Sequence, residues 1–220
     1  MWDLTWCGWF ATAWSRALPD MPLPEDSLRV AIAGVASLRG QDLKLWMEES
    51  GFPAGEVRLF DEEPLVGTLT DVAGEAAFIQ AINQDSFRRL RFVFFAGSPA
   101  FARLHGPAAI SAGAAVIDLT GELASIPGAR PWIPRLDSVL APPAHSDRAE
   151  HGGRVLLAPS APAIMACSLC SVLAEFAARR VAITFFSPAS ERGNEGVEEL
   201  SEQMVKLLSL QAIPQDVFDC

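Results

Sequence analysis

The chain has 220 residues, of which half are hydrophobic and a fifth charged. This composition supports a well-filled core and excludes disorder along the whole chain, and the length fits one large domain or one domain plus part of another. The formal net charge of -10 argues against a nucleic-acid partner, because no basic stripe is present to neutralise phosphates. No apolar run approaches the length of a bilayer span, so we expect no membrane association.

Cysteine usage indicates a reducing compartment. Cys7, Cys167, Cys170 and Cys220 do not form a disulfide framework, so we expect a cytoplasmic protein. Cys167 and Cys170 form a CxxC pair, but a metal site would need a second pair and none exists. We therefore predict no metal site and interpret the pair as small apolar packing residues, with a redox or metal role as the alternative.

Residues 1–20 carry four of the six tryptophans and differ in composition from the rest of the chain. No positive segment precedes their apolar part, so they make a poor secretory signal. Met21 is the more natural start of the protein. We expect residues 1–27 to be an N-terminal extension outside the fold.

From residue 28 onward, strand-like and helix-like patterns alternate. This alternation predicts an α/β fold with a Rossmann-like, doubly wound parallel sheet over residues 28–138. The expected strands are 30–33, 56–60, 68–72, 92–95 and 115–118, the expected helices are 41–49 and 100–112, and 76–82 is an amphipathic stretch.

Residues 139–153 contain Pro and Gly and are predicted to be a linker. After it we expect a strand at 154–157, a helix from about 161 to 178, a strand at 180–186 and a helix at 195–208. The first of these helices is apolar almost all round, which predicts burial or a place in a subunit interface.

The most informative stretch joins the first strand to the first helix. Gly34 and Gly40 bracket a turn in the context that a dinucleotide-binding loop requires, with the helix N-terminus facing a pyrophosphate. Ser37 stands where such loops carry a middle glycine. The alternative interpretation is an ordinary tight turn in a parallel sheet.

Several segments together resemble the aspartate-semialdehyde dehydrogenases. They run in order from residue 28 to about 218 and comprise 30–43, 52–60, 95–98, 112–118, 193–200 and 214–218. The resemblance implies the fold of an oxidoreductase that acts in amino-acid biosynthesis. This fold has a Rossmann-like NAD(P)-binding domain followed, over residues 154–220, by an incomplete α+β catalytic and dimerisation domain. It identifies the chain as a divergent and C-terminally short member.

The resemblance also implies that the catalytic chemistry is missing. In the family a cysteine at the start of the second domain's first helix attacks the aldehyde as a thiolate. The matching position here is Ala161, and the adjacent Ser160 is expected only to cap the helix. The substrate-phosphate arginine would fall within 121–124, where no arginine stands, and the later catalytic residues would lie beyond Cys220. We therefore predict no catalytic residue; the alternative is an active NAD(P)-dependent semialdehyde oxidoreductase.

The cofactor side of the resemblance is partly eroded. Asp61 follows the second strand, where a carboxylate suits a ribose hydroxyl and repels a 2′-phosphate, so if a nucleotide binds we expect NAD rather than NADP. The predicted cofactor-binding residues are Gly34, Ala36, Ser37, Leu38, Gly40, Asp61, Ala96, Gly97 and Ser98.

Other polar residues have simpler interpretations. His105, His145 and His151 are scattered, and the last two fall in the linker. Asp118 ends a strand and is either functional or a turn cap. The carboxylates Glu195, Glu198, Glu199 and Glu202 are interpreted as a solvated helix face near the helix N-terminus.

Two other functional hypotheses remain open. The chain could act as an interaction protein that forms a homodimer, or pairs with an active paralogue, through residues 154–220, since its apolar helix and incomplete domain leave hydrophobic surface uncovered. It could also be a truncated or decaying copy without a selected function.

Overall fold

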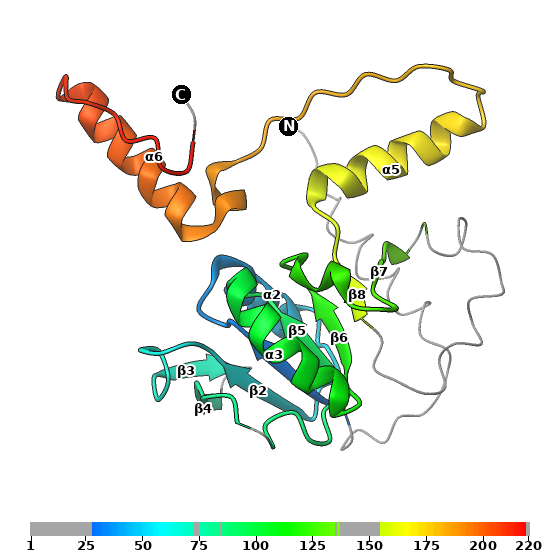
Figure 1. The fold of residues 1–220 in the computed structure, drawn as a ribbon, viewed down its shortest axis with the longest axis vertical. Coiled ribbons are helices and arrows are strands. Elements are labelled where there is room, and N and C mark those ends of the chain that lie inside the picture. The colour runs from blue at the N-terminus through cyan, green and yellow to red at the C-terminus, as the bar shows by residue number, and fades with distance from the viewer. Residues whose placement is uncertain (1–27, 73–74, 84, 135, 137–154, 219–220) are drawn as a thin grey trace, which may run out of the picture.

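The computed structural model describes residues 28–72, 75–83, 85–134, 136 and 155–218 (Figure 1). The expectations for the extension at 1–27 and the linker at 139–153 lie outside these residues, as do Cys7, His145, His151 and Cys220.

A six-stranded sheet forms the centre of the described structure (Figure 1). Its strand order is β2-β1-β5-β6-β8-β7, and every neighbouring pair is parallel. The predicted α/β fold with a parallel sheet is therefore confirmed. The strands are β1 (Arg29–Ala33), β2 (Glu56–Phe60), β5 (Phe92–Phe95), β6 (Ala115–Asp118), β7 (Arg130–Pro131) and β8 (Val155–Leu157).

Two helices cover opposite faces of this sheet, which makes it doubly wound. Successive residues of β1 point to opposite faces. Ile32 joins the cluster that contains Met47 of α2 (Leu38–Glu49), whereas Ala31 and Ala33 join the cluster that contains Phe101 of α3 (Pro99–Ser111). The centre of β1 is fully buried because β2 and β5 flank it and the two helices cover its faces.

A small antiparallel pair lies beside the sheet. β3 (Leu69–Val72) matches the predicted strand, and β4 (Glu75–Phe78) forms where we expected only an amphipathic stretch. The connection after β6 contains the short 3-10 helix η1 (Glu122–Ser125).

The sheet does not end at residue 138. β8 pairs with both β6 and β7, so the strand that we expected to open the second domain belongs to the first sheet. The division of the chain into domains at 28–138 and 154–220 otherwise stays a prediction.

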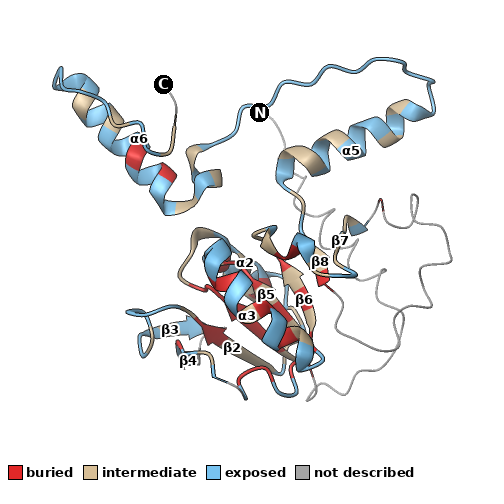
Figure 2. Cartoon of the chain, viewed as in Figure 1, coloured by how far each residue is buried: buried red, intermediate tan, exposed pale blue. Residues whose placement is uncertain are grey.

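The segments after β8 pack much less than the sheet. They are α5 (Ala161–Ala174), η3 (Ala189–Arg192) and α6 (Gly193–Leu208). The expected burial of α5 within the chain is wrong, since none of its residues is buried (Figure 2). The expected strand at 180–186 is also wrong: the segment is extended but has no neighbouring strand among the described residues, and a strand needs one to satisfy its backbone groups.

One buried carboxylate organises the end of the described chain. Glu199 of α6 is 6% exposed and accepts hydrogen bonds from the backbone N–H groups of Asp216 (3.0 Å), Val217 (2.6 Å) and Phe218 (3.0 Å), and from Nε2 of Gln203 (2.9 Å). The interpretation of Glu199 as part of a solvated face is therefore wrong, although Glu195, Glu198 and Glu202 are exposed as expected. Burial raises the pKa of Glu199, but these four donors outweigh it and leave the pKa below its usual value.

None of the described helices is long and apolar enough to cross a membrane.

Replacing Glu199 by Gln is expected to release residues 214–218 from α6. The single amide oxygen can accept only two hydrogen bonds, so at least two of the four donors, at least one of them a backbone N–H group, lose their acceptor. Hydrogen exchange of the amides at 216–218 should accelerate at least about tenfold in the variant. Because the folded-state pKa is depressed, the wild-type protection should persist above the carboxyl's ordinary pKa and be lost as the pH falls through the folded value.

Glu198→Gln is the matched control, since Glu198 is the exposed neighbour on the same helix. Equal exchange rates at 216–218 in the two variants would contradict the role assigned to Glu199.

Candidate functional site

The carboxyl edge of the sheet between β1 and β5 is the natural place for a ligand. The strand order reverses there, since β2 lies on one side of β1 and the later strands lie on the other, and open α/β sheets bind ligands in the crevice at such a point. The loops that leave β1 and β5 meet in this crevice. A Cβ built on Gly34 would lie 2.1 Å from the Cα of Gly97, so neither loop has room for a side chain at this contact.

Gly34 and Gly40 shape the turn as the sequence predicted. Gly34 has φ +90°, which favours glycine, and its N–H donates to the carbonyl of Phe60 (2.8 Å). A Cβ on Gly40 would lie 2.2 Å from the carbonyl oxygen of Gly34. Gly40 therefore lets α2 pack directly against the turn, as the third glycine of a dinucleotide-binding loop does.

Ser37 fits the turn at the position where dinucleotide-binding loops carry their middle glycine. Its φ of -65° suits any residue, and its hydroxyl accepts from the N–H of Gly40 (2.9 Å). The same hydroxyl lies 2.8 Å from the carbonyl oxygen of Gly34 and 2.7 Å from that of Ala96, to which its single hydrogen can donate. Since Ser37 caps α2, the helix begins at Leu38, three residues earlier than expected.

Asp61 reaches the glycine turn from β2. Its Oδ2 accepts from the N–H of Ala36 (2.7 Å), and its Oδ1 accepts from the N–H of Glu62 (2.8 Å). The carboxylate thus lies at the end of β2 beside the turn, where an acidic residue can accept hydrogen bonds from a ribose. Each of its oxygens keeps a second lone pair for another donor.

Glu62 makes a contact that sequence reasoning missed. Its Oε1 accepts from the hydroxyl of Ser98 (2.6 Å), the residue that caps α3 through the N–H of Phe101 (3.1 Å). His105, further along α3, packs edge-on against Phe101, with ring centroids 4.6 Å apart. Burial lowers the pKa of His105, and the charge of Glu62 opposes that shift. The only signal in the sequence was an acidic residue directly after a strand that ends at this edge.

The first turn of α2 has unused donors. Within the described structure, the N–H groups of Leu38 and Arg39 have no hydrogen-bond acceptor, and the helix carries no acidic residue in its first turn. The guanidinium of Arg39 is exposed and donates to the carbonyl of Glu191 in η3 (3.2 Å). Two backbone donors and one cation therefore stand beside the turn, which suits an anionic group.

The structure thus brings all nine predicted cofactor-binding residues to one edge of the sheet, in the β1–α2 turn, at the end of β2 and in the β5–α3 connection. Their role in binding a cofactor stays a prediction.

The position matched to a catalytic cysteine lies on the same edge. Ala161 is the first residue of α5, directly after the turn that follows β8. Ser160 occupies the N-cap position, but its side chain makes no capping hydrogen bond, so the capping role that we expected for it is wrong.

Asp118 is a turn cap. It is fully buried at the end of β6, and its carboxylate accepts from the N–H and hydroxyl of Thr120 and from the N–H of Leu123. Its own carbonyl accepts from the N–H of Ala158 (2.8 Å). Asp118 therefore holds the turn before α5, and three donors of the protein already bind its carboxylate.

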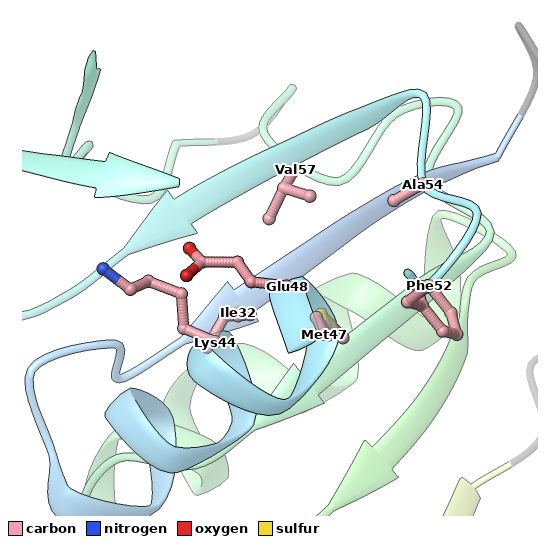
Figure 3. A pocket seen from close by; sticks show the side chains of 7 residues that line it. All are labelled: Ile32, Lys44, Met47, Glu48, Phe52, Ala54 and Val57. Carbon is pink, nitrogen blue, oxygen red and sulfur yellow. The ribbon is translucent and has the colours of Figure 1, made fainter. Parts of the chain in front are cut away.

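The remaining candidates are not drawn together. Cys167 and Cys170 are exposed on α5, so the packing role that we expected for them is wrong. No cluster of three metal-ligating side chains occurs among the described residues. A shallow hollow beside α2 contains no predicted cofactor-binding residue (Figure 3); it is lined by Ile32, Lys44, Met47, Glu48, Phe52, Ala54 and Val57.

Comparison with known families decides the assignment. A sequence model described as "Semialdehyde dehydrogenase, NAD binding domain" matches residues 29–141, about half of the chain. The chain belongs to this family. The predicted resemblance is therefore confirmed for the domain that carries the glycine turn.

Individual relatives agree with this assignment. The chain is 31% identical over 196 residues to a USG-1 protein homolog of Pseudomonas aeruginosa and 23% identical over 191 residues to the aspartate-semialdehyde dehydrogenase of Bacillus subtilis, covering 87% and 86% of this chain. It spans about half the length of these curated relatives, 55% and 53% respectively.

Solved structures show the same fold. A probable aspartate-semialdehyde dehydrogenase from Pseudomonas aeruginosa superposes with a TM-score of 0.65 at 26% identity, covering 88% of this chain and 56% of that one. Aspartate semialdehyde dehydrogenase II from Vibrio cholerae superposes with a TM-score of 0.73 at 21% identity over the same shares.

The close approach at the turn predicts a large cost for Gly34→Ala. The added methyl group would overlap the backbone of Gly97, so one loop must move, at a cost of about 1–3 kcal/mol beyond the conformational strain. Gly113→Ala is the matched control, because Gly113 also has a positive φ (+84°) but has open space around it, leaving only about 1–2 kcal/mol of strain. Urea unfolding of both variants measures the difference, and equal losses of stability would contradict the close-contact role.

Proposed function

We propose that this chain is an NAD-binding member of the semialdehyde dehydrogenase family that does not oxidise aldehydes. The observation that supports this proposal is that the predicted cofactor-binding residues gather at one edge of the sheet, whereas residue 161, which the family resemblance matches to the nucleophile, is an alanine. A family sequence model for an NAD-binding domain supports the first half of the proposal.

The pyrophosphate would be held at the start of α2. The open N–H groups of Leu38 and Arg39 supply two donors, the helix dipole adds partial positive charge, and the exposed Arg39 side chain adds a full one. The tight turn at Gly34 lets the backbone come close to the ligand.

Asp61 would select NAD over NADP. Its carboxylate is already fixed by the N–H of Ala36, so its position does not depend on the ligand. The remaining lone pairs can accept from adenosine ribose hydroxyls, whereas a 2′-phosphate would meet the negative charge of this carboxylate.

Aldehyde oxidation would be absent because no group can carry the acyl intermediate. Alanine forms neither a thiohemiacetal nor a thioester. Ser160 is adjacent, but the described structure gives its hydroxyl no hydrogen bond to a base, and an unactivated serine is a weak nucleophile. Bound NAD would supply a hydride acceptor, but residues 160–161 offer no covalent step that would use it.

Calorimetric titration of the purified, folded chain tests this function. We expect saturable binding of NAD and binding of NADP weaker by at least about tenfold, from like-charge repulsion at the ribose. Asp61→Ala should reduce the ratio between the affinities for NAD and NADP. Asp42→Ala removes the same charge from an exposed position on α2 and should leave this ratio unchanged.

The same samples should give no nicotinamide reduction with aspartate semialdehyde and phosphate. Steady reduction would refute the catalytic part of the proposal, and absence of NAD and NADP binding by the folded chain would refute the binding part.

A second candidate function is self-association through residues 154–220. It rests on one observation: α5 exposes Met165, Leu169 and Val172 along one helical face, to 56%, 45% and 56%, and α6 exposes further large apolar residues. Covering such a stripe with a second copy or with a paralogue would remove this apolar surface from water.

Sedimentation velocity tests the self-association. We expect a dimer whose dissociation constant rises at least about tenfold in Leu169→Lys, because the charge would be buried in the interface. Ser168→Lys adds the same charge at the preceding exposed position and should have a smaller effect. A monodisperse monomer at high concentration would count against this candidate.

A further inference from the structure

The crevice between β1 and β5 is bridged by the chain itself. β2 and β5 lie on either side of β1, so a contact from the loop after β2 to the loop after β5 passes over the carboxyl end of β1. The hydrogen bond from Ser98 to the carboxylate of Glu62 (2.6 Å) is such a contact. Dinucleotides cross open α/β sheets at this switch point.

The bridge is anchored at both ends. On the β2 side, the preceding Asp61 is tied to the glycine turn through the N–H of Ala36, and the N–H of Leu65 donates to the carbonyl of Glu62 (3.0 Å). On the β5 side, Ser98 is the N-cap of α3, where a carboxylate is favoured by the helix dipole. Both Glu62 and Ser98 are exposed, so water can compete for either partner and the bond can open.

We propose that Glu62 is a gate over the nucleotide crevice, closed by Ser98 and opened when the adenosine half of a dinucleotide enters. This inference rests on the proposed NAD binding and names the residue that regulates it. Only the fraction of molecules with the bond open can bind, so the observed dissociation constant is the intrinsic one divided by that fraction. The gate therefore weakens binding without touching the reactive end of the cofactor.

Glu62 and Asp61 then have different roles, although they are adjacent. Asp61 faces the glycine turn and keeps lone pairs for a ligand while it stays in place. Glu62 uses its carboxylate on the far side of the crevice and must give up Ser98 before a ligand can pass.

Titration of NAD into the full chain and two variants tests the gate. Glu62→Ala removes the bridge and should bind NAD about three- to tenfold more tightly than the wild type, the fold-change expected for one lost hydrogen bond in the closed state. Glu63→Ala is the matched control, because Glu63 is exposed, carries the same charge one residue away and makes no hydrogen bond or ion pair within the described structure. It should change affinity less than twofold.

Hydrogen exchange gives a second readout, because a purely structural role of Glu62 would not make amide exchange depend on NAD. In the wild type, saturating NAD should speed exchange of the amides of Leu65 and Thr68, which lie in the loop that Glu62 anchors. In Glu62→Ala these amides should exchange rapidly with or without NAD.

The failures of the two proposals are distinguishable. Binding by all three proteins with equal affinity, or weaker binding by Glu62→Ala, overturns the gate and leaves the proposed function standing. No binding by any of them, Glu62→Ala included, overturns the proposed NAD binding, and the gate with it.

Discussion

The contact between the backbones of Gly34 and Gly97 fixes the geometry of the candidate site. It brings the loop after β1 against the loop after β5 with no side chain between them. Ser37 then spans the same gap from its side chain to the carbonyl of Ala96, and Gly40 lets α2 begin against the turn. The glycine turn, the first turn of α2 and the start of α3 are therefore positioned together by the protein, before any ligand enters.

This arrangement also supplies hydrogen-bond donors to the carboxylates beside the turn. Asp61 and Glu62 end the strand next to the turn, and each carboxylate finds a donor inside the protein, one in the turn and one at the cap of α3. The acidic loop is compatible with folding because the glycine turn and the start of α3 supply these donors. An anionic ligand that needs the same donors must compete for them with the two carboxylates.

The sequence predicted the parts of this fold that depend on local pattern. Alternating strand-like and helix-like patterns sufficed to predict a doubly wound parallel sheet, and the spacing of Gly34 and Gly40 sufficed for the turn. The strand order and the place of β7 and β8 in the same sheet were not predicted. The errors lie where a tertiary partner decides the outcome. Glu199 looks like a solvated carboxylate on its own helix, and only the returning segment at 216–218 makes it buried. The extended segment at 180–186 has the composition of a strand, yet no strand lies beside it in the described structure.

Some features of the candidate site could likewise be predicted from the sequence, and others required the structure. The nine predicted cofactor-binding residues were named from the glycine motif and the family resemblance. The Glu62–Ser98 contact, in contrast, joins positions 36 residues apart and depends on which strands are neighbours. Asp118 could not be assigned from sequence, because a functional carboxylate and a turn cap look alike until its donors at Thr120 and Leu123 are seen.

The glycine turn and the position matched to a catalytic cysteine are structurally separate. The groups around the glycine turn come from residues 34–98, between the end of β1 and the start of α3, whereas Ala161 follows β8 and begins a helix with no buried residue. Alanine is the best helix former and α5 buries none of its residues, so the fold itself requires no thiol at the start of this helix.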